Sequence, residues 1–119
     1  MNICIGNTDD HARNHSAFWG GHELSLTPAY DLCPQPRSGR EANQAMAFGP
    51  EGQRASRLRL LGESAPVYHL GDRGAEDLIQ GVVAAIRESF AAAADRARLT
   101  TAEAEAFWGR QILNPYIFE

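Results

Sequence analysis

The stretch GNTDDHARNHS, residues 6–16, decides how the rest of this chain is interpreted. It holds two aspartates, two asparagines and two histidines, and it directly follows the apolar run Ile3-Cys4-Ile5. Asparagine and aspartate favour turns because their side chains hydrogen-bond the nearby backbone, so a solvated turn is the simplest interpretation. A metal site and a catalytic loop are the two alternatives.

A metal site would use His11 and His15, which are four residues apart and would share one face if the stretch were helical. The stretch lacks the glutamate of an H-E-x-x-H motif, and Asn14 stands where a further acidic ligand would help. Histidine-based metal catalysis is therefore the least favoured of the three interpretations.

The catalytic-loop interpretation depends on spacing. Asp9 and Asn14 are five residues apart (14 − 9 = 5), as in the D-x-x-x-x-N of a protein-kinase catalytic loop. There the aspartate accepts the proton of the substrate hydroxyl, and the asparagine binds Mg²⁺ through its side-chain oxygen. A second aspartate must follow a hairpin, and Asp31 stands 22 residues after Asp9 (31 − 9 = 22), behind a predicted strand. Together these spacings predict a Mg²⁺ site of oxygen ligands.

The segments NICIGNTDDHARNHS and LSLTPAYDL together resemble the HipA-like serine/threonine kinases, which carry an I-G-x-T-D-x-H-x-x-N loop and a later P-x-Y-D segment. The resemblance implies that Asp9 is the catalytic aspartate. It also implies that Asn14 and Asp31 bind Mg²⁺ and, through it, ATP. His11 occupies the motif histidine and is expected to support the loop, and Tyr30 is expected to pack beside Asp31 and fix its approach.

The resemblance also implies an activity and partners. HipA-like kinases are the toxins of HipBA-type toxin–antitoxin modules, and they transfer the γ-phosphoryl group of ATP to a protein serine or threonine with Mg²⁺. They are longer than this chain and carry an N-terminal lobe with an ATP-contacting lysine, whereas all 11 basic residues here are arginines. We therefore expect the C-terminal portion of such a kinase, inactive without the missing N-terminal lobe. The implied partner is a HipB-like DNA-binding antitoxin.

A second class of function stays open beside the kinase. The chain could be a non-catalytic remnant, a binding module that contacts an antitoxin or a partner subunit. Neither alternative identifies a protein substrate.

Composition narrows the class of protein. The 119 residues fit one domain, with 44% hydrophobic and 22% charged residues. The net charge of −4 argues against direct binding of nucleic acid or an anionic membrane. Cys4 and Cys33 form no CxxC motif, and no apolar run approaches the ~20 residues of a membrane span. We expect a cytoplasmic protein with free thiols.

The expected fold class is α+β and mainly helical: a protein-kinase-like C-lobe with a β-hairpin beside the catalytic loop. Residues 1–33 would hold the catalytic loop and the metal-site hairpin, with strands at 17–19 and 23–27 joined by Gly20-Gly21. Residues 34–66 form an irregular region, in which 46–66 could hold a short strand and one helix. Residues 67–119 form a helical region.

Two helices are predicted in that last region. From Ala75 onward, apolar residues at helical spacing indicate an amphipathic helix with an inward face of Leu78, Val82, Ile86, Phe90 and Ala93, flanked by Ile79 and Val83. A capping box, Thr100-x-x-Glu103, predicts the start of a second helix, and Pro115 predicts its end.

Overall fold

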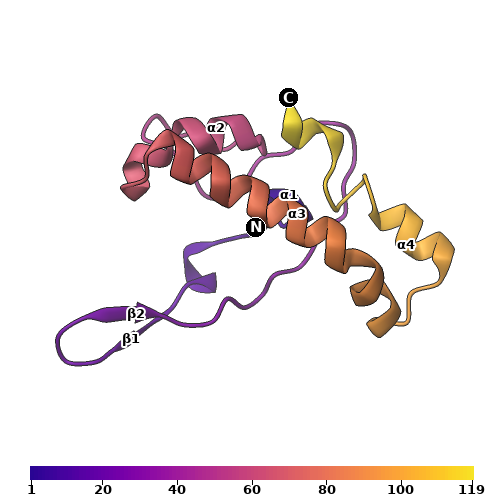
Figure 1. Cartoon of the computed structure of the whole chain (residues 1–119), viewed down its shortest axis with the longest axis horizontal. Helices are drawn as coiled ribbons and strands as arrows, with labels where there is room; N and C mark the ends of the chain where they lie inside the picture. The colour runs from indigo at the N-terminus through magenta and orange to yellow at the C-terminus, as the bar shows by residue number, and fades with distance from the viewer.

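The computed structural model describes the whole chain, residues 1–119 (Figure 1). Its elements, in chain order, are the helix α1 (Asn2–Ile5), the 3₁₀ helix η1 (Ala12–Asn14), the strands β1 (Ala17–Trp19) and β2 (Leu24–Leu26), the helix α2 (Leu58–Glu63), the 3₁₀ helix η2 (Ala65–Tyr68), the helices α3 (Asp72–Arg96) and α4 (Thr101–Phe107), and the 3₁₀ helix η3 (Pro115–Phe118). The fold is therefore a mainly helical α+β arrangement with one small hairpin. No helix is both long enough and apolar enough to cross a membrane.

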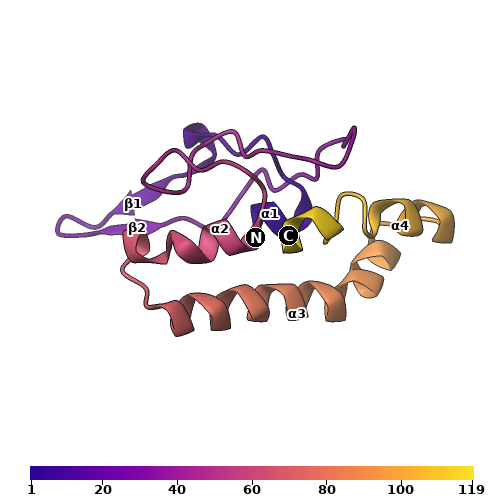
Figure 2. The same cartoon turned by 90° about the horizontal axis from the view of Figure 1, so that it is seen from above.

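The core lies between α3 and the two ends of the chain. Helix α2 runs beside α3, and the two views show α1 and η3 close to the middle of α3 (Figure 2). The buried core side chains come from all of these elements: Ile3, Cys4, Leu58, Val83, Ile86, Ile112, Leu113 and Ile117. Burial of this apolar surface supplies the main favourable term for folding a chain of this size.

The N-terminal helix is joined to the C-terminal segment at two points. The backbone N–H of Leu113 donates to the carbonyl of Cys4 at 2.7 Å. Gly6 ends α1 with a φ of 68°, and a Cβ there would stand 2.7 Å from the carbonyl oxygen of Gln111. Only glycine satisfies both the left-handed backbone and this close approach. These two contacts fix the position of the end of α1, from which the chain continues at Asn7.

The predicted hairpin is present, with a different turn. Strands β1 and β2 pair antiparallel, with Trp19 opposite Leu24, and the N–H of Gly20 donates to the carbonyl of Glu23 at 3.2 Å. The two central turn residues are therefore Gly21 and His22, one position later than predicted. Gly21 has a φ of 91°, and a positive φ at the first central position is what glycine allows in a tight hairpin turn. Both views show the hairpin projecting from the helical body (Figures 1 and 2).

The long helix α3 is longer than predicted and turned slightly about its axis. It begins at Asp72, and its buried residues are Ala75, Val83, Ile86 and Ala94. Leu78, expected on the inward face, is 57% exposed. The inward face is the one directed at α2 and the chain ends, which periodicity cannot identify when apolar residues cover a broad stripe.

The last predicted helix starts as expected and ends early. The capping box is present in α4: the backbone N–H of Glu103 donates to Thr100 Oγ1 at 3.3 Å, and the Glu103 carboxylate accepts from the Thr100 N–H at 2.8 Å. The helix ends at Phe107, eight residues before Pro115 (115 − 107 = 8), because Trp108 has an extended backbone. Pro115 instead opens η3, where a proline suits the first helical position.

The region 34–66 contains the helix α2 and the first residues of η2, and loops make up the rest. The helix expected there is α2, whereas the short strand is absent: an isolated bridge between Asn43 and Ala55 is the sole extended pairing. The buried side chains of Gln44 and Ser56 hydrogen-bond at 3.0 Å and hold this loop together.

Candidate functional site

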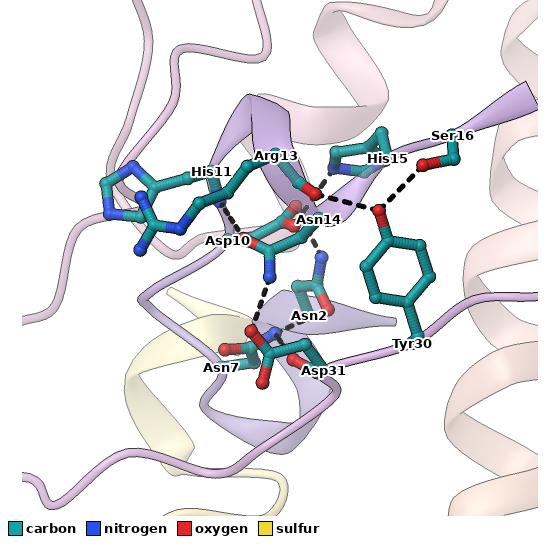
Figure 3. Close-up of polar contacts among 10 residues, drawn as sticks. All are labelled: Asn2, Asn7, Asp10, His11, Arg13, Asn14, His15, Ser16, Tyr30 and Asp31. Atoms are coloured by element: carbon teal, nitrogen blue, oxygen red, sulfur yellow. Dashed lines mark hydrogen bonds and ion pairs between the residues drawn. The ribbon is translucent and has the colours of Figure 1, made fainter.

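The polar stretch begins on a buried asparagine. Asn7 is 2% exposed and donates its side-chain amide to Asn2 Oδ1 at 3.2 Å and to the carbonyl of Asp31 at 3.4 Å (Figure 3). One side chain therefore joins α1 to the segment that follows the hairpin. Sequence reasoning gave Asn7 no role, because nothing in the sequence distinguishes a buried asparagine from a turn residue.

Asn14 and Asp31 lie against each other at the base of the hairpin. Asn14 is the last residue of η1, it is 8% exposed, and its Nδ2 donates to Asp31 Oδ2. Its Oδ1 accepts the backbone N–H of His11 at 2.9 Å. Figure 3 shows the two side chains pointing toward each other. The hairpin thus brings together two residues that the sequence proposed as a pair.

Asp31 adopts an unusual backbone conformation. Its φ of 56° lies in the left-handed region, which aspartate visits more readily than most residues but still at a cost in free energy. Such conformations persist where surrounding contacts fix them, and they gather at functional sites. Here the contacts are the Asn7 amide on the Asp31 carbonyl and the Asn14 amide on the carboxylate.

Asp9 is connected to this pair only through His11. Its Oδ1 lies 2.8 Å from Nε2 of His11, and the Asp9 side chain is 56% exposed. It makes no direct hydrogen bond to Asn14 or Asp31; the link runs through His11, whose backbone N–H is held by Asn14. The carboxylate is therefore oriented by His11 and open to a molecule from solvent, and its role as a base stays a prediction.

Tyr30 joins the two ends of the hairpin. Its hydroxyl donates to the carbonyl of Arg13 at 2.7 Å, and Ser16 Oγ lies 2.8 Å from the same hydroxyl (Figure 3). The N–H of Thr27 adds a backbone bond to the carbonyl of Ser16 at 3.0 Å. These contacts hold residues 13–16 against residue 30, and hence Asn14 against Asp31.

Asp10, which sequence reasoning left without a role, anchors the other side of the loop. Its carboxylate accepts from Asn2 Nδ2 at 2.6 Å and lies 3.0 Å from His15 Nε2. His11 and His15 thus contact two different aspartates, so they do not form the histidine pair that a shared metal ligation needs. A cleft of about 250 Å³ opens beside Asp10 and His15 and is lined mainly by apolar side chains, among them Phe48.

The donor set at Asn14 and Asp31 fits a small divalent cation. A carboxylate and an amide oxygen are hard ligands, and Mg²⁺ takes one or two protein ligands together with phosphate and water. No group of three His, Cys, Asp or Glu side chains comes together here, which argues against a Zn²⁺-type site. To offer its oxygen to a cation beside Asp31, the Asn14 amide has to rotate, since its nitrogen now faces that carboxylate.

Comparison with known proteins gives one family. The family model described as the HipA-like C-terminal domain matches residues 1–90, which include all five predicted site residues. No curated protein matches the chain, and no solved structure does.

Proposed function

We propose that this chain, which belongs to the family of HipA-like C-terminal domains, carries the base and the metal ligands of a Mg²⁺-dependent protein serine/threonine kinase. In this proposal the fold is the equivalent of a kinase C-lobe. Asp9 is the catalytic base, Asn14 and Asp31 hold Mg²⁺ and thereby ATP, and His11 and Tyr30 support the loop.

The observation that carries the proposal is the contact of Asn14 with Asp31 across the hairpin. The kinase motif requires an asparagine from the catalytic loop and an aspartate from beyond a hairpin to share one cation. Both residues meet here, in a family whose model matches three quarters of the chain (90 of 119 residues). The Asp9 carboxylate is 56% exposed and contacts the ring of His11, whose backbone N–H donates to Asn14 Oδ1.

The chain's own groups have distinct tasks in this reaction. Asp9 receives the proton of the acceptor serine or threonine hydroxyl, and His11 fixes the orientation of that carboxylate. Asn14 and Asp31 position the metal-bound phosphates, while Tyr30 keeps the two residues together. Bound Mg²⁺ supplies positive charge that offsets the charge developing on the transferred phosphoryl group.

The 119 residues contain no lysine, so the cation that clamps the ATP phosphates in kinases must come from elsewhere. We therefore expect residues 1–119 alone to transfer phosphoryl groups at a negligible rate, because phosphoryl transfer depends on positioning and charge neutralisation. Addition of a lysine-bearing N-terminal lobe of a HipA-like kinase should restore transfer.

The test is a radiolabel transfer assay with Mg²⁺ and ATP, on the chain alone and with that lobe in trans. Asp9→Asn should abolish the restored transfer, whereas Asp72→Asn, at the start of α3, should leave it intact. Robust transfer by the chain alone, or restored transfer that survives Asp9→Asn, contradicts the proposal.

A second candidate function is a binding module for an antitoxin or a partner subunit. The observation that favours it is the hairpin, where Trp19, Leu24 and Leu26 lie on one face and are 65%, 70% and 82% exposed. Exposed apolar patches of this kind mark interaction surfaces. Replacing Trp19 and Leu24 by serine should then abolish binding of the cognate antitoxin, and Asp9→Asn should not. For a chain that acts only as a kinase, Asp9→Asn should abolish phosphoryl transfer and the serine replacements should not.

A further inference from the structure

Ser38 lies in an exposed loop among arginine side chains. The loop PQPRSGRE, residues 34–41, contains no helix or strand, and Ser38 is exposed. Arg37 and Arg40 lie on either side of it in sequence. Arg110, which follows α4 in the chain, reaches the same loop. Arg37 and Arg40 therefore lie in the loop that carries Ser38, and the Arg110 guanidinium group reaches its backbone.

Two of these guanidinium groups hydrogen-bond the backbone on either side of Ser38. Arg110 Nη2 donates to the carbonyl of Arg37 at 3.4 Å, and Arg37 Nη2 donates to the carbonyl of Arg40. One guanidinium group therefore lies at the carbonyl of the residue before Ser38, and the other at the carbonyl of the residue two positions after it. A neutral carbonyl is a weaker partner for guanidinium than a doubly charged phosphate would be.

The charges of Arg37 and Arg110 have no carboxylate partner. Arg40 is paired with Glu119 at 2.5 Å, and Arg57 lies 3.9 Å from the same carboxylate, but neither Arg37 nor Arg110 forms an ion pair. The Nε of Arg37 is buried without a hydrogen-bond partner, and burial lowers the pKa of its guanidinium. An anion placed at this loop would offset that desolvation.

The one acidic side chain within this loop is Glu41, which lines a polar pocket of about 200 Å³ together with Arg37 and Ser38. Glu41 forms no ion pair within the cluster, so the arginines outnumber the acids around Ser38. The local field therefore favours added negative charge.

We propose that Ser38 is a phosphorylation site whose phosphate is held by Arg37 and Arg110. In the modification, a protein kinase forms the bond between Ser38 Oγ and the γ-phosphorus of ATP. The bond from that phosphorus to the β,γ-bridging oxygen breaks, ADP leaves, and the hydroxyl proton passes to the base of the kinase. The phosphate replaces weak carbonyl contacts of the two guanidinium groups with charge-assisted hydrogen bonds.

Such a phosphate would fix the loop that follows Asp31. The segment is already joined to the end of α1 at one point, where the N–H of Gln35 donates to the carbonyl of Gly6 at 3.0 Å. Pro34 and Pro36 limit its backbone freedom. A phosphate on Ser38, clamped from Arg110 beyond α4, adds a second attachment and orders the loop, as phosphorylation opposite an arginine cluster does elsewhere.

The experiment places phosphoserine at position 38 of the 119-residue chain by genetic encoding and follows its ³¹P resonance with pH. The second pKa of the phosphate should be lower by roughly 0.5 to 1 pH unit than in a free peptide of residues 32–46, because nearby opposite charge favours the dianion. Arg110→Gln, a change at an exposed side chain, should reverse part of that difference. Phosphoserine at Ser25, an exposed strand residue with no arginine bonded to its backbone, is the matched control.

A phosphate at Ser38 that titrates as in the free peptide overturns the proposed clamp. Mass spectrometry of the chain from cells that produce it naturally gives the second readout, and phosphate on Ser38 is the expected result. Peptides covering residue 38 that are unmodified under every growth condition overturn the modification.

Discussion

The side-chain amide of Asn14 is hydrogen-bonded to the carboxylate of Asp31, although the two residues are 17 positions apart in sequence and a whole hairpin lies between them. The contact exists because the hairpin returns the chain to its starting point and the Tyr30 hydroxyl joins its two ends. Burial of Asn14 and the left-handed backbone of Asp31 fix the two side chains at one place. The two side chains are therefore held together, and a rotation of the Asn14 amide, which also releases the His11 N–H, would let both offer oxygen to a shared cation.

Replacing Asn14 by aspartate should turn this pair into a metal-dependent one. Two adjacent carboxylates repel, so Asn14→Asp should lower the free energy of unfolding by about 1 to 3 kcal/mol at neutral pH. Millimolar Mg²⁺ should restore most of that loss, because the cation binds the folded state alone. Urea unfolding with and without Mg²⁺ measures both effects.

Gln80→Glu is the matched control, because the Gln80 amide also donates to a carboxylate, that of Glu76, at 2.7 Å on the surface of α3. That pair lies on an exposed helix face, so the change should cost at most a few tenths of a kcal/mol. If Mg²⁺ stabilises both variants equally, Asn14 and Asp31 do not form a specific cation site.

Removing the Tyr30 hydroxyl should loosen the site more than it destabilises the fold. Tyr30→Phe loses the bonds to Arg13 and Ser16, which at an exposed position are worth about 0.5 to 1 kcal/mol together. Because these bonds hold the hairpin ends, amide hydrogen exchange at residues 13–16 and 30–31 should become faster.

Tyr68→Phe provides the comparison, since the Tyr68 hydroxyl donates to the carbonyl of Phe48 at 2.7 Å and is exposed to a similar degree. It should cost a similar free energy and leave exchange at the hairpin base unchanged. Equal exchange at residues 13–16 in both variants would show that Tyr30 does not secure the site.

The C-terminal segment should be essential to the fold. Ile117 is fully buried at 0% exposure and belongs to the core that also contains Ile3 and Cys4. Ile117→Ala should lower the free energy of unfolding by about 2 to 5 kcal/mol through lost burial and the cavity left behind. Leu26→Ala, at an 82% exposed position, should change it by less than about 0.5 kcal/mol. Thermal or urea unfolding distinguishes the two, and comparable losses would contradict the packing described.

The capping box of α4 should make stability depend on pH. Hydrogen bonds from the backbone and side chain of Thr100 lower the pKa of Glu103. A carboxyl whose pKa is depressed on folding stabilises the fold above its unfolded pKa, and that contribution disappears as pH falls through the folded value.

The Tm difference between the wild-type chain and Glu103→Ala should therefore be constant at neutral pH and shrink from about pH 5 downward. Glu105→Ala, two residues on and outside the capping box, should show no such trend. A Tm difference for Glu103→Ala that stays the same down to pH 3 would contradict the depressed pKa.

Much of this arrangement can be predicted from local patterns. The hairpin, the capping box at Thr100 and the long helix α3 follow from turn residues, cap residues and apolar periodicity. Motif spacing predicts that Asn14 and Asp31 lie together, because a hairpin returns its two ends to one point; the structure has them in contact through the Asn14 nitrogen, and the shared cation stays a prediction. Local sequence carries these features, since each depends on residues close together in the chain.

Features that depend on contacts between residues far apart in the sequence were not predicted. The hairpin turn moved by one residue, to Gly21 and His22, because strand register and not the glycine pair fixes it. The early end of α4 at Phe107 depends on the tight turn that leads back to the core. The anchoring role of Asn7 depends in part on the carbonyl of Asp31, 24 positions away in sequence.

The proposed kinase requires Asn14 and Asp31 to form the cation site that holds the nucleotide. The most direct measurement is the ¹H–¹⁵N NMR spectrum of the 119-residue chain with ATP and substoichiometric Mn²⁺, a paramagnetic replacement for Mg²⁺ that broadens nearby amide signals. Broadening centred on residues 14 and 31, lost in Asp31→Asn, is the expected result. Uniform broadening, or broadening centred on the acidic start of α3 at Asp72 and Glu76, would contradict it.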